Sequence, residues 1–190
     1  NGFEVILDKT AFFPEGGGQP GDRGLIGEAK VIDTVEKDDE IIHICDAAVS
    51  GRVNCTLDFD LRFSNMQQHS GEHIFSGLVY KRYGYTNVGF HLSNQIVTMD
   101  FDGVLSESEA ERIEWEVNEV ISKNLPIEVS FPSSDQLASM QYRSKIEIEG
   151  EVRIVTIPGY DVCACCAPHV KRTGEIGMLK VMSIQNYKGG

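Results

Sequence analysis

The first 60 residues alternate apolar and polar positions in short stretches, as β-strands with one buried face do. These stretches are rich in Val, Ile and Thr, and turn residues separate them. They read FEVIL at residues 3–7, KVIDTV at 30–35, EIIHIC at 40–45 and VNCTLDF at 53–59. Short strands with glycine-rich connections predict a small β-barrel or β-sandwich over residues 1–60.

From Ser64 onward the apolar positions follow a helical spacing. Residues 64–84 predict one helix, with Ser64 as its N-cap and Gly84 as the residue after its C-cap. A second helix follows Ser106, which forms a capping box with Glu109. Its apolar positions make one stripe that we expect to be buried, namely Ala110, Ile113, Val117, Val120 and Ile121.

The remaining apolar stretches predict more strands and one short helix. The strand candidates are QIVTMDF at residues 95–101, IEVSF at 127–131, EVRIVTI at 151–157 and MLKVM at 178–182, and the helix covers 135–141. Residues 61–190 are therefore predicted as a second domain in which helices pack on a mostly antiparallel sheet. The fold class of the whole chain is α+β.

Charge limits the partners that we expect. The 190 residues carry 29 acidic and 17 basic side chains, a formal net charge of −12. A uniform polyanion binds nucleic acid weakly, because phosphate contacts need Lys and Arg. An RNA partner therefore requires a local basic patch. The candidates are Lys81 with Arg82, Arg143 with Lys145, Lys171 with Arg172, and Lys180.

The cysteine count is odd, since the chain contains five. No apolar run approaches the roughly 20 residues of a membrane span, and no signal peptide is recognisable. We therefore expect a cytoplasmic protein with reduced thiols and with neither a membrane nor DNA as partner. The chain begins at Asn1 rather than Met, so we expect its natural start to lie upstream.

His69 and His73 are the first candidates for chemistry. Their spacing of four places both imidazoles on one helix face, one turn apart, as a single tetrahedral ion requires. Glu72 does not follow the first histidine, so the zinc-protease motif is absent, and we expect this carboxylate at the rim or in a salt bridge. The pair alone is equally compatible with two solvated or core histidines.

The stretch VCACCAPHV adds Cys165 and His169, again four apart. Together with the helical pair they would form a His₃Cys set, and sulfur with imidazole favours zinc over magnesium or calcium. Cys163 shares the face of Cys165 in an extended segment and is the alternative ligand. Cys166 should point elsewhere, where we expect it to tune the shape of the pocket.

Three other interpretations of the cysteines stay open. Cys163 and Cys166 have the spacing of a redox pair, although no βαβ pattern surrounds them. One cysteine could instead be a nucleophile that a histidine activates. The zinc could also be structural, because four protein ligands saturate a tetrahedral ion and leave no place for water.

Four motifs, in order along most of the chain, resemble the editing domain of alanyl-tRNA synthetase and the free-standing alanyl-tRNA editing proteins of the AlaX type. They are PEGGGQPGD at 14–22, QQHSGEHIFSG at 67–77, TNVGFHL at 86–92, and the Cys-x-x-x-His that leads into HVKRTGEIG at 169–177. The resemblance implies an N-terminal β-barrel followed by an α/β editing domain of a type shared with threonyl-tRNA synthetase.

The resemblance also implies an activity. It is the ATP-independent hydrolysis, in trans and at a zinc ion, of the ester of mischarged tRNA, most often serine or glycine on alanine tRNA. By motif position the zinc ligands would be His69, His73, Cys165 and His169. His69, His73 and His91 would act in catalysis. Substrate and tRNA contacts are expected from Gly16, Gly17, Gly18, Gln19, Arg143, Lys145, Lys171 and Arg172.

Two points limit the resemblance. On spacing alone, the glycines of residues 16–18 are interpreted as a flexible connector. The alanine-type motif is usually Cys-Gly-Gly-Thr-His, whereas residues 165–169 read Cys-Cys-Ala-Pro-His with a threonyl-type ending. Substrate identity is therefore open, as is the oligomeric state. The alternatives are a tRNA-binding module with a structural zinc and a metal-dependent hydrolase of small esters or amides.

Overall fold

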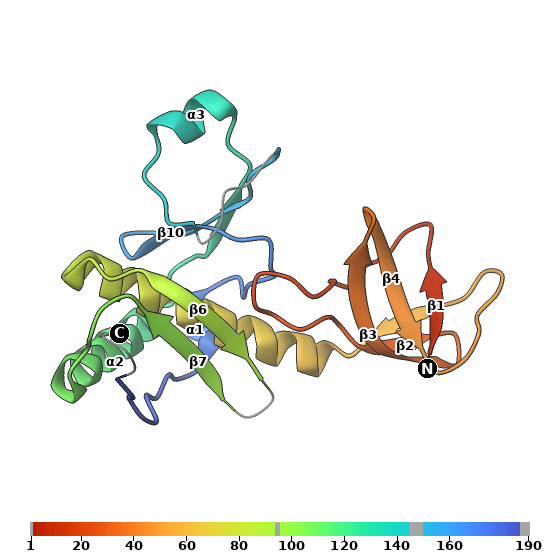
Figure 1. Cartoon of the computed structure of the whole chain (residues 1–190), viewed down its shortest axis with the longest axis horizontal. Helices are drawn as coiled ribbons and strands as arrows, with labels where there is room; N and C mark the ends of the chain where they lie inside the picture. Colours follow the sequence, from red (N-terminus) through yellow and green to blue (C-terminus); the bar gives the residue numbers. More distant parts are fainter. Residues whose placement is uncertain (1, 94–95, 145–149, 187–190) are drawn as a thin grey trace. The chain divides into compact units, whose positions relative to one another are not determined.

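The computed structural model describes residues 2–93, 96–144 and 150–186. Two compact units make up the chain, Asn1–Asn65 and Met66–Gly190, and each is described by itself. Helices and antiparallel strands both occur, so the α+β class is confirmed (Figure 1).

The first unit is built on a five-stranded antiparallel sheet with the order β1-β4-β3-β2-β5. The ladder ends at β1 on one side and at β5 on the other. Within the described residues no pairing joins these two edges, so a closed barrel stays a prediction. The strands are β1 (Phe3–Ile6), β2 (Gly24–Ile26), β3 (Ala29–Lys37), β4 (Glu40–Cys45) and β5 (Cys55–Leu57).

One inner face of this sheet carries the core of the unit, formed by Val5, Phe12, Ile26, Ala29, Val31 and Cys45. His43 lies fully buried beside it. Its Nδ1 lies 2.9 Å from the carbonyl oxygen of Val5, and its Nε2 lies 2.8 Å from Oγ1 of Thr10. Both ring nitrogens are therefore satisfied, and this histidine has a structural role.

The glycine-rich loop is an ordered turn, so its interpretation as a flexible connector is wrong. Gly16 and Gln19 exchange two backbone hydrogen bonds of 3.1 and 3.0 Å. Between them, Gly17 and Gly18 have φ angles of 60° and 82°. Residues with a Cβ adopt this left-handed region at a cost of about 1–2 kcal/mol each, so a hairpin turn of this kind selects glycine.

The loop is fastened at its base by Asp22, whose side chain is almost fully buried. Arg62 donates from Nε to both carboxylate oxygens, at 2.8 and 2.9 Å, and also from Nη2. The backbone N–H of Phe13 donates to the same carboxylate at 2.6 Å. Because Arg62 lies in the first turns of α1 (Phe59–Tyr83), this buried ion pair fixes the loop to the start of the helix.

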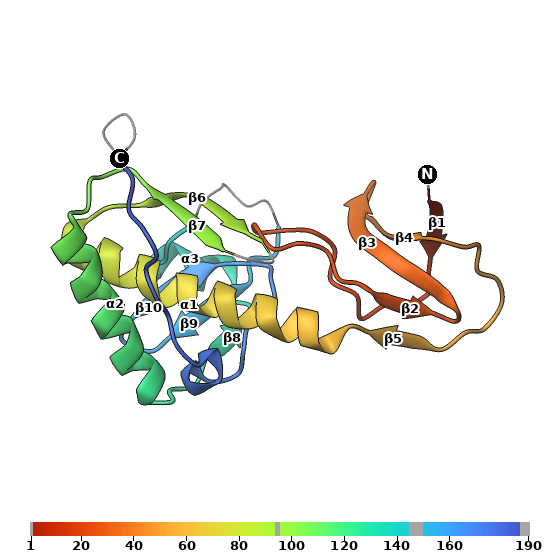
Figure 2. The same ribbon diagram turned by 90° about the horizontal axis from the view of Figure 1, so that it is seen from below.

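The second unit surrounds the rest of α1 (Figure 2). Around the helix lie the β6–β7 hairpin, helix α2 and an antiparallel sheet with the order β10-β9-β8. The elements are β6 (Asn87–Leu92), β7 (Val97–Phe101), α2 (Glu107–Ser122), β8 (Glu128–Ser130), α3 (Ser134–Ser139), β9 (Ile154–Ile157), β10 (Asp161–Ala164) and the 3₁₀ helix η1 (Thr173–Ile176).

Helices α1 and α2 are buried in different ways. In α2 the predicted stripe and the capping box of Ser106 with Glu109 are both confirmed, and the other face is polar apart from the exposed Trp115. In α1 every residue from 69 to 79 is buried, whatever its direction. This helix is covered on all sides although it carries His, Glu and Ser, so its sequence has no amphipathic pattern. The periodicity of its apolar residues therefore predicts neither its burial nor its packing.

The start of α1 differs from the prediction. The helix begins at Phe59 rather than after Ser64, because Asp58 caps it: its Oδ1 accepts the N–H of Leu61 at 3.1 Å. The end agrees with the prediction, since Gly84 has a φ of 74° and donates its N–H to the carbonyl of Tyr80.

The MLKVM segment is not a strand. The side-chain amide of Asn118 in α2 binds the N–H and the carbonyl of Leu179 at 3.0 and 2.8 Å. Glu114, one turn earlier, accepts the N–H of Val181 at 2.7 Å and the ammonium of Lys180 at 2.8 Å. Side chains of α2 thus satisfy the backbone groups that a neighbouring strand would otherwise bind.

None of the helices in the described part of the chain combines the length and the apolar character that crossing a bilayer requires.

Replacing Asp58 with Ala should lower the free energy of unfolding by about 0.5–2 kcal/mol, because the first turn of α1 loses its N-cap. Asp58→Asn keeps a side-chain oxygen at the cap and should stay close to wild type. Urea unfolding followed by circular dichroism measures both variants. Equal losses would show that the carboxylate acts through something other than capping.

Candidate metal centre

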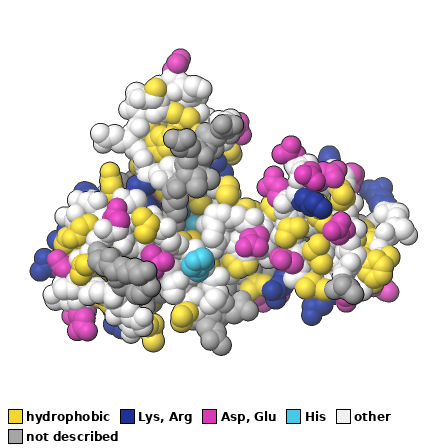
Figure 3. Space-filling view, viewed as in Figure 1, with side chains coloured by type: hydrophobic (Ala, Val, Ile, Leu, Met, Phe, Trp, Pro, Cys, Tyr) yellow, Lys and Arg dark blue, Asp and Glu magenta, His cyan; other side chains and the backbone are white. Residues whose placement is uncertain are grey.

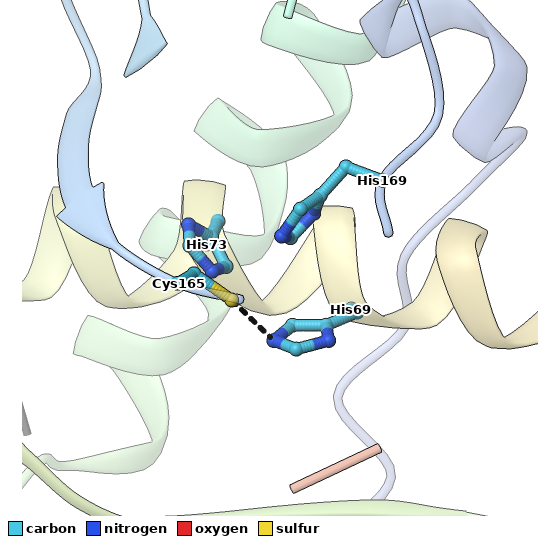
Figure 4. A group of neighbouring side chains, drawn as sticks. All are labelled: His69, His73, Cys165 and His169. Carbon is cyan, nitrogen blue, oxygen red and sulfur yellow. Dashed lines mark hydrogen bonds between the residues drawn. The ribbon is translucent and has the colours of Figure 1, made fainter. Parts of the chain in front are cut away.

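Four side chains that are distant in the sequence converge inside the second unit. His69 and His73 come from α1, whereas Cys165 and His169 come from the loop after β10 (Figure 4). One ligand atom from each residue lies within 4.8 Å of the corresponding atoms of the other three. The Cys165 sulfur is 3.7 Å from Nε2 of His69, and the three histidines are buried.

The loop that presents Cys165 and His169 is held by Arg153. One nitrogen of its guanidinium, Nη1, donates to the carbonyls of Cys165 and Ala167 at 2.6 and 2.8 Å. The N–H of Cys165 donates in return to the carbonyl of Arg153 at 3.0 Å. Three hydrogen bonds to one residue therefore fix the backbone between the two ligands.

His169 is suited to bind a metal. Its Nδ1 lies 3.1 Å from Oγ of Ser70, and its Nε2 is buried with no hydrogen-bond partner in the described part of the chain. Burial, together with the charges of His73 and His69, lowers the pKa of His169 well below its usual value. A neutral imidazole with a buried, unused nitrogen is what a cation requires.

His73 and Cys165 favour the opposite charge states. Burial acts to lower the pKa of His73, but hydrogen bonds to Asp161 and Cys165 outweigh it and raise that pKa well above its usual value. Burial acts to raise the pKa of Cys165, but the bond to His73 outweighs it and the pKa is lowered. The sulfur is thus prepared to be a thiolate, which is the form that binds zinc. The donor set fits zinc.

Asp161 belongs to the centre although sequence analysis missed it. Its Oδ2 lies 3.0 Å from Nδ1 of His73, and Arg143 donates from Nε to Oδ1 at 2.7 Å and from Nη2 to Oδ2 at 2.9 Å. Burial opposes ionisation, yet these hydrogen bonds lower the pKa of Asp161. The sequence did contain a signal for this residue. In an extended segment Asp161 shares a face with Cys163 and Cys165, and it lies four residues before Cys165.

His73, Asp161 and Cys163 form a second group whose possible ligand atoms also lie within 4.8 Å of one another. Here, however, the guanidinium of Arg143 already binds both oxygens of Asp161. Burial raises the pKa of Cys163, which favours the neutral thiol. A second cation beside Arg143 would be repelled, and these contacts favour the set that contains Cys165.

We expected Glu72 at the rim or in a salt bridge; it is almost fully buried, so the rim is wrong, and the basic group beside it is His73. Its Oε1 accepts hydrogen bonds of 2.6 Å from the hydroxyl of Ser76 and from the side-chain amide of Asn87. Asn87 opens β6, so this carboxylate joins the hairpin to α1. Its other oxygen, Oε2, lies 3.9 Å from Nε2 of His73.

His91 lies outside the cluster. It is exposed on β6, whereas its neighbour Phe90 is buried with its ring centroid 4.8 Å from that of His69. Adjacent residues of a strand face opposite sides, so the side that meets the cluster carries Phe90. The catalytic role of His91 stays a prediction.

The basic candidates are placed differently from one another. The side chain of Arg143 is mostly covered where it meets Asp161, whereas Lys171 and Arg172 are exposed two and three residues after His169. Lys145 lies outside the described residues. On the face drawn in Figure 3, the Lys and Arg side chains of the described residues lie apart rather than in one patch. The glycine loop belongs to the first unit, and its contact with substrate stays a prediction.

The known proteins that this chain resembles include alanyl-tRNA editing proteins. Residues 152–190 match the family described as threonyl and alanyl tRNA synthetase second additional domain. The chain is 37% identical to alanyl-tRNA editing protein AlaX-L of Pyrococcus horikoshii over 94% of its own length and 47% of that protein. It is 33% identical to alanyl-tRNA editing protein Aarsd1 of Danio rerio, over 98% of its own length and 47% of that protein.

A longer protein matches as well. The chain is 33% identical to the alanine–tRNA ligase of Ignicoccus hospitalis, over 98% of its own length but 22% of the ligase. The chain thus spans about half the length of the editing proteins that it matches and a smaller part of the ligase.

The three neighbouring cysteines should differ in their effect on zinc content. Cys165→Ala should abolish stoichiometric zinc, because it removes the only sulfur of the four-residue set. Cys163→Ala and Cys166→Ala should keep about one zinc per chain, as one tetrahedral site implies. Elemental analysis after gel filtration measures this. Zinc lost with Cys163 but retained without Cys165 would reverse the assignment.

Proposed function

Since the chain is a homologue of the alanyl-tRNA editing proteins, we propose that it is a trans-editing hydrolase that cleaves the ester of mischarged aminoacyl-tRNA. The observation that supports this most is the buried convergence of His69, His73, Cys165 and His169. We propose seryl- or glycyl-tRNA specific for alanine as substrate, zinc as cofactor, no need for ATP, and the cytoplasm as location.

A zinc ion held by these four residues would polarise the ester carbonyl through a fifth contact, or would supply a water of lowered pKa in the place of one released ligand. The protein itself orients the histidine rings and excludes water from one side of the cluster. Ser70 and Asp161 fix the rings of His169 and His73, and Phe90 closes the side of His69 against water. Because the three histidines are buried and Cys165 is partly exposed, we place the entry of the substrate on the Cys165 side.

We propose separate roles for the two halves of the chain. Residues 61–190 would form the zinc-binding editing domain. Residues 1–60 would form a β-barrel-like domain whose turn at Gly16, Gly17, Gly18 and Gln19 contacts the substrate. Lys171 and Arg172 are the exposed candidates for tRNA contact, with Arg143 and Lys145 proposed from sequence alone. His91 is retained as a proposed catalytic group.

Cys165→Ala should lower the rate of deacylation by about 100-fold or more, because the Lewis acid contributes several kcal/mol. The assay follows release of serine and glycine from a panel of mischarged alanine tRNAs, with correctly charged tRNA as reference. Cys55→Ala changes an exposed thiol of the first unit and should leave the rate unchanged.

The same panel separates the competing functions. Affinity for tRNA without turnover by the wild type would indicate a binding module with a structural zinc. Hydrolysis of small esters that does not depend on tRNA would indicate a general metal-dependent hydrolase.

Replacing both Lys171 and Arg172 with Ala should weaken tRNA binding and flatten its dependence on salt. Each lost phosphate contact should reduce the slope of log K against log salt by about 0.7–0.9. Lys180→Ala is the control, since Glu114 already pairs with that ammonium. An unchanged slope would place the tRNA elsewhere on the protein.

A further inference from the structure

Three side chains are joined in series by hydrogen bonds, Arg143 to Asp161 and Asp161 to His73. We propose that Arg143 and Asp161 are positioning residues that hold His73 with its Nε2 toward the other ligands, and that Gly77 makes the room that this arrangement needs. The inference rests on the proposed zinc site. It gives Arg143 a role in the metal centre instead of the contact with tRNA that the sequence suggested.

The two ring nitrogens of His73 have different partners. Its Nδ1 is bound to Oδ2 of Asp161 at 3.0 Å, which leaves Nε2 for the cluster. A histidine that binds a metal through one nitrogen is oriented by the partner of the other, commonly a carboxylate. Among the described residues, the side-chain contact at Nδ1 is to Asp161 alone.

Asp161 is itself held in place by Arg143. Arg143 approaches it as a planar fork, with Nε on Oδ1 and Nη2 on Oδ2, and only 9% of the arginine side chain is exposed. Backbone hydrogen bonds of 2.8 Å to Val162 and Ala164 place Arg143 alongside β10. Both carboxylate oxygens are therefore fixed, which a lysine ammonium cannot achieve with the same geometry.

Gly77 lies one helical turn after His73 and therefore on the same face of α1. A Cβ at this position would lie 2.5 Å from the carbonyl oxygen of Tyr160 and 2.8 Å from Cβ of Asp161. Neither atom is the far end of a flexible side chain, so the turn before β10 would have to move away. Glycine at this position lets Asp161 approach close enough to reach His73.

The test compares two double variants, because removal of one buried partner alone would leave an uncompensated charge. Arg143→Met with Asp161→Leu removes the carboxylate and its counter-ion together. Arg143→Met with Asp161→Asn keeps a carbonyl oxygen that can accept from Nδ1. Zinc affinity is measured by competition with a chromophoric chelator, and cobalt(II) absorption reports the ligand field.

The Leu double variant should bind zinc about 10–100-fold more weakly than wild type, as is usual when such a partner is lost. The Asn double variant should recover part of that affinity, and the cobalt(II) spectrum should change in the same order. The control is Arg82→Met with Glu116→Leu, which removes a more exposed ion pair between α1 and α2 and should have no effect.

Glycine variants on one helix give an independent test. Gly77→Ala should weaken zinc binding about 10-fold or more. Gly71→Ala should not, because its Cβ would meet only Leu179 and Ile176 at 3.4 and 3.6 Å, an ordinary contact. Circular dichroism and thermal unfolding establish that each variant is folded.

The outcomes distinguish the two proposals. If the wild type binds zinc and the folded Leu variant binds it equally well, the positioning role is overturned while the zinc site stands. If the wild type binds no zinc, the zinc site fails and the positioning role fails with it. Should the Leu variant not fold, the Asn and Gly77 variants decide, and wild-type affinity in both overturns the inference.

Discussion

The burial of a polar helix segment is the constraint on which the second unit depends. Every residue of α1 from 69 to 79 is out of water, and a buried polar group without a partner costs roughly 1–3 kcal/mol. Side chains and one backbone N–H from other elements supply the partners. Asn87 binds Glu72, the loop after β10 binds Ser70, and the turn before β10 brings Asp161 to His73. Hydrogen bonds of the helix thus determine where β6, β10 and the ligand loop lie.

The charged side chains at the centre of the second unit are also paired with one another. The buried carboxylate of Asp161 is compensated by the guanidinium of Arg143, and the pKa of His73 is raised while that of His169 is lowered. Burial acts to lower the pKa of both histidines, but at His73 hydrogen bonds to Asp161 and Cys165 outweigh it, whereas at His169 the charges of His73 and His69 add to it. Their environments differ at the nitrogen that faces away from the cluster, which is where the protein controls the basicity of a ligand.

What could be predicted from sequence was local. The stripe and cap of α2 follow from spacing within 16 residues, and the histidine pair follows from one helical turn. Burial of Glu72, the fork of Arg143 and the attachment of Leu179 to Asn118 are contacts between distant segments, and no periodicity encodes them. The early start of α1 was missed because Asp58 follows a strand pattern directly, with no turn residue between them. Cys165 and His169 could be placed together from sequence because both lie in one short motif, and the structure brings them to the histidine pair.

The clamp at Arg153 has an evolutionary consequence. It holds the carbonyls of Cys165 and Ala167, so the path of the backbone between the two ligands does not depend on the side chain at 166, which is exposed. Mutations can therefore accumulate at that position without moving either ligand. A substitution at 166 would then change the group that the loop presents to incoming molecules while His69, His73, Cys165 and His169 keep their places. Under the proposed zinc site, the departure from the usual glycine-rich motif would change what the loop presents to a substrate and leave the four side chains of the cluster in place.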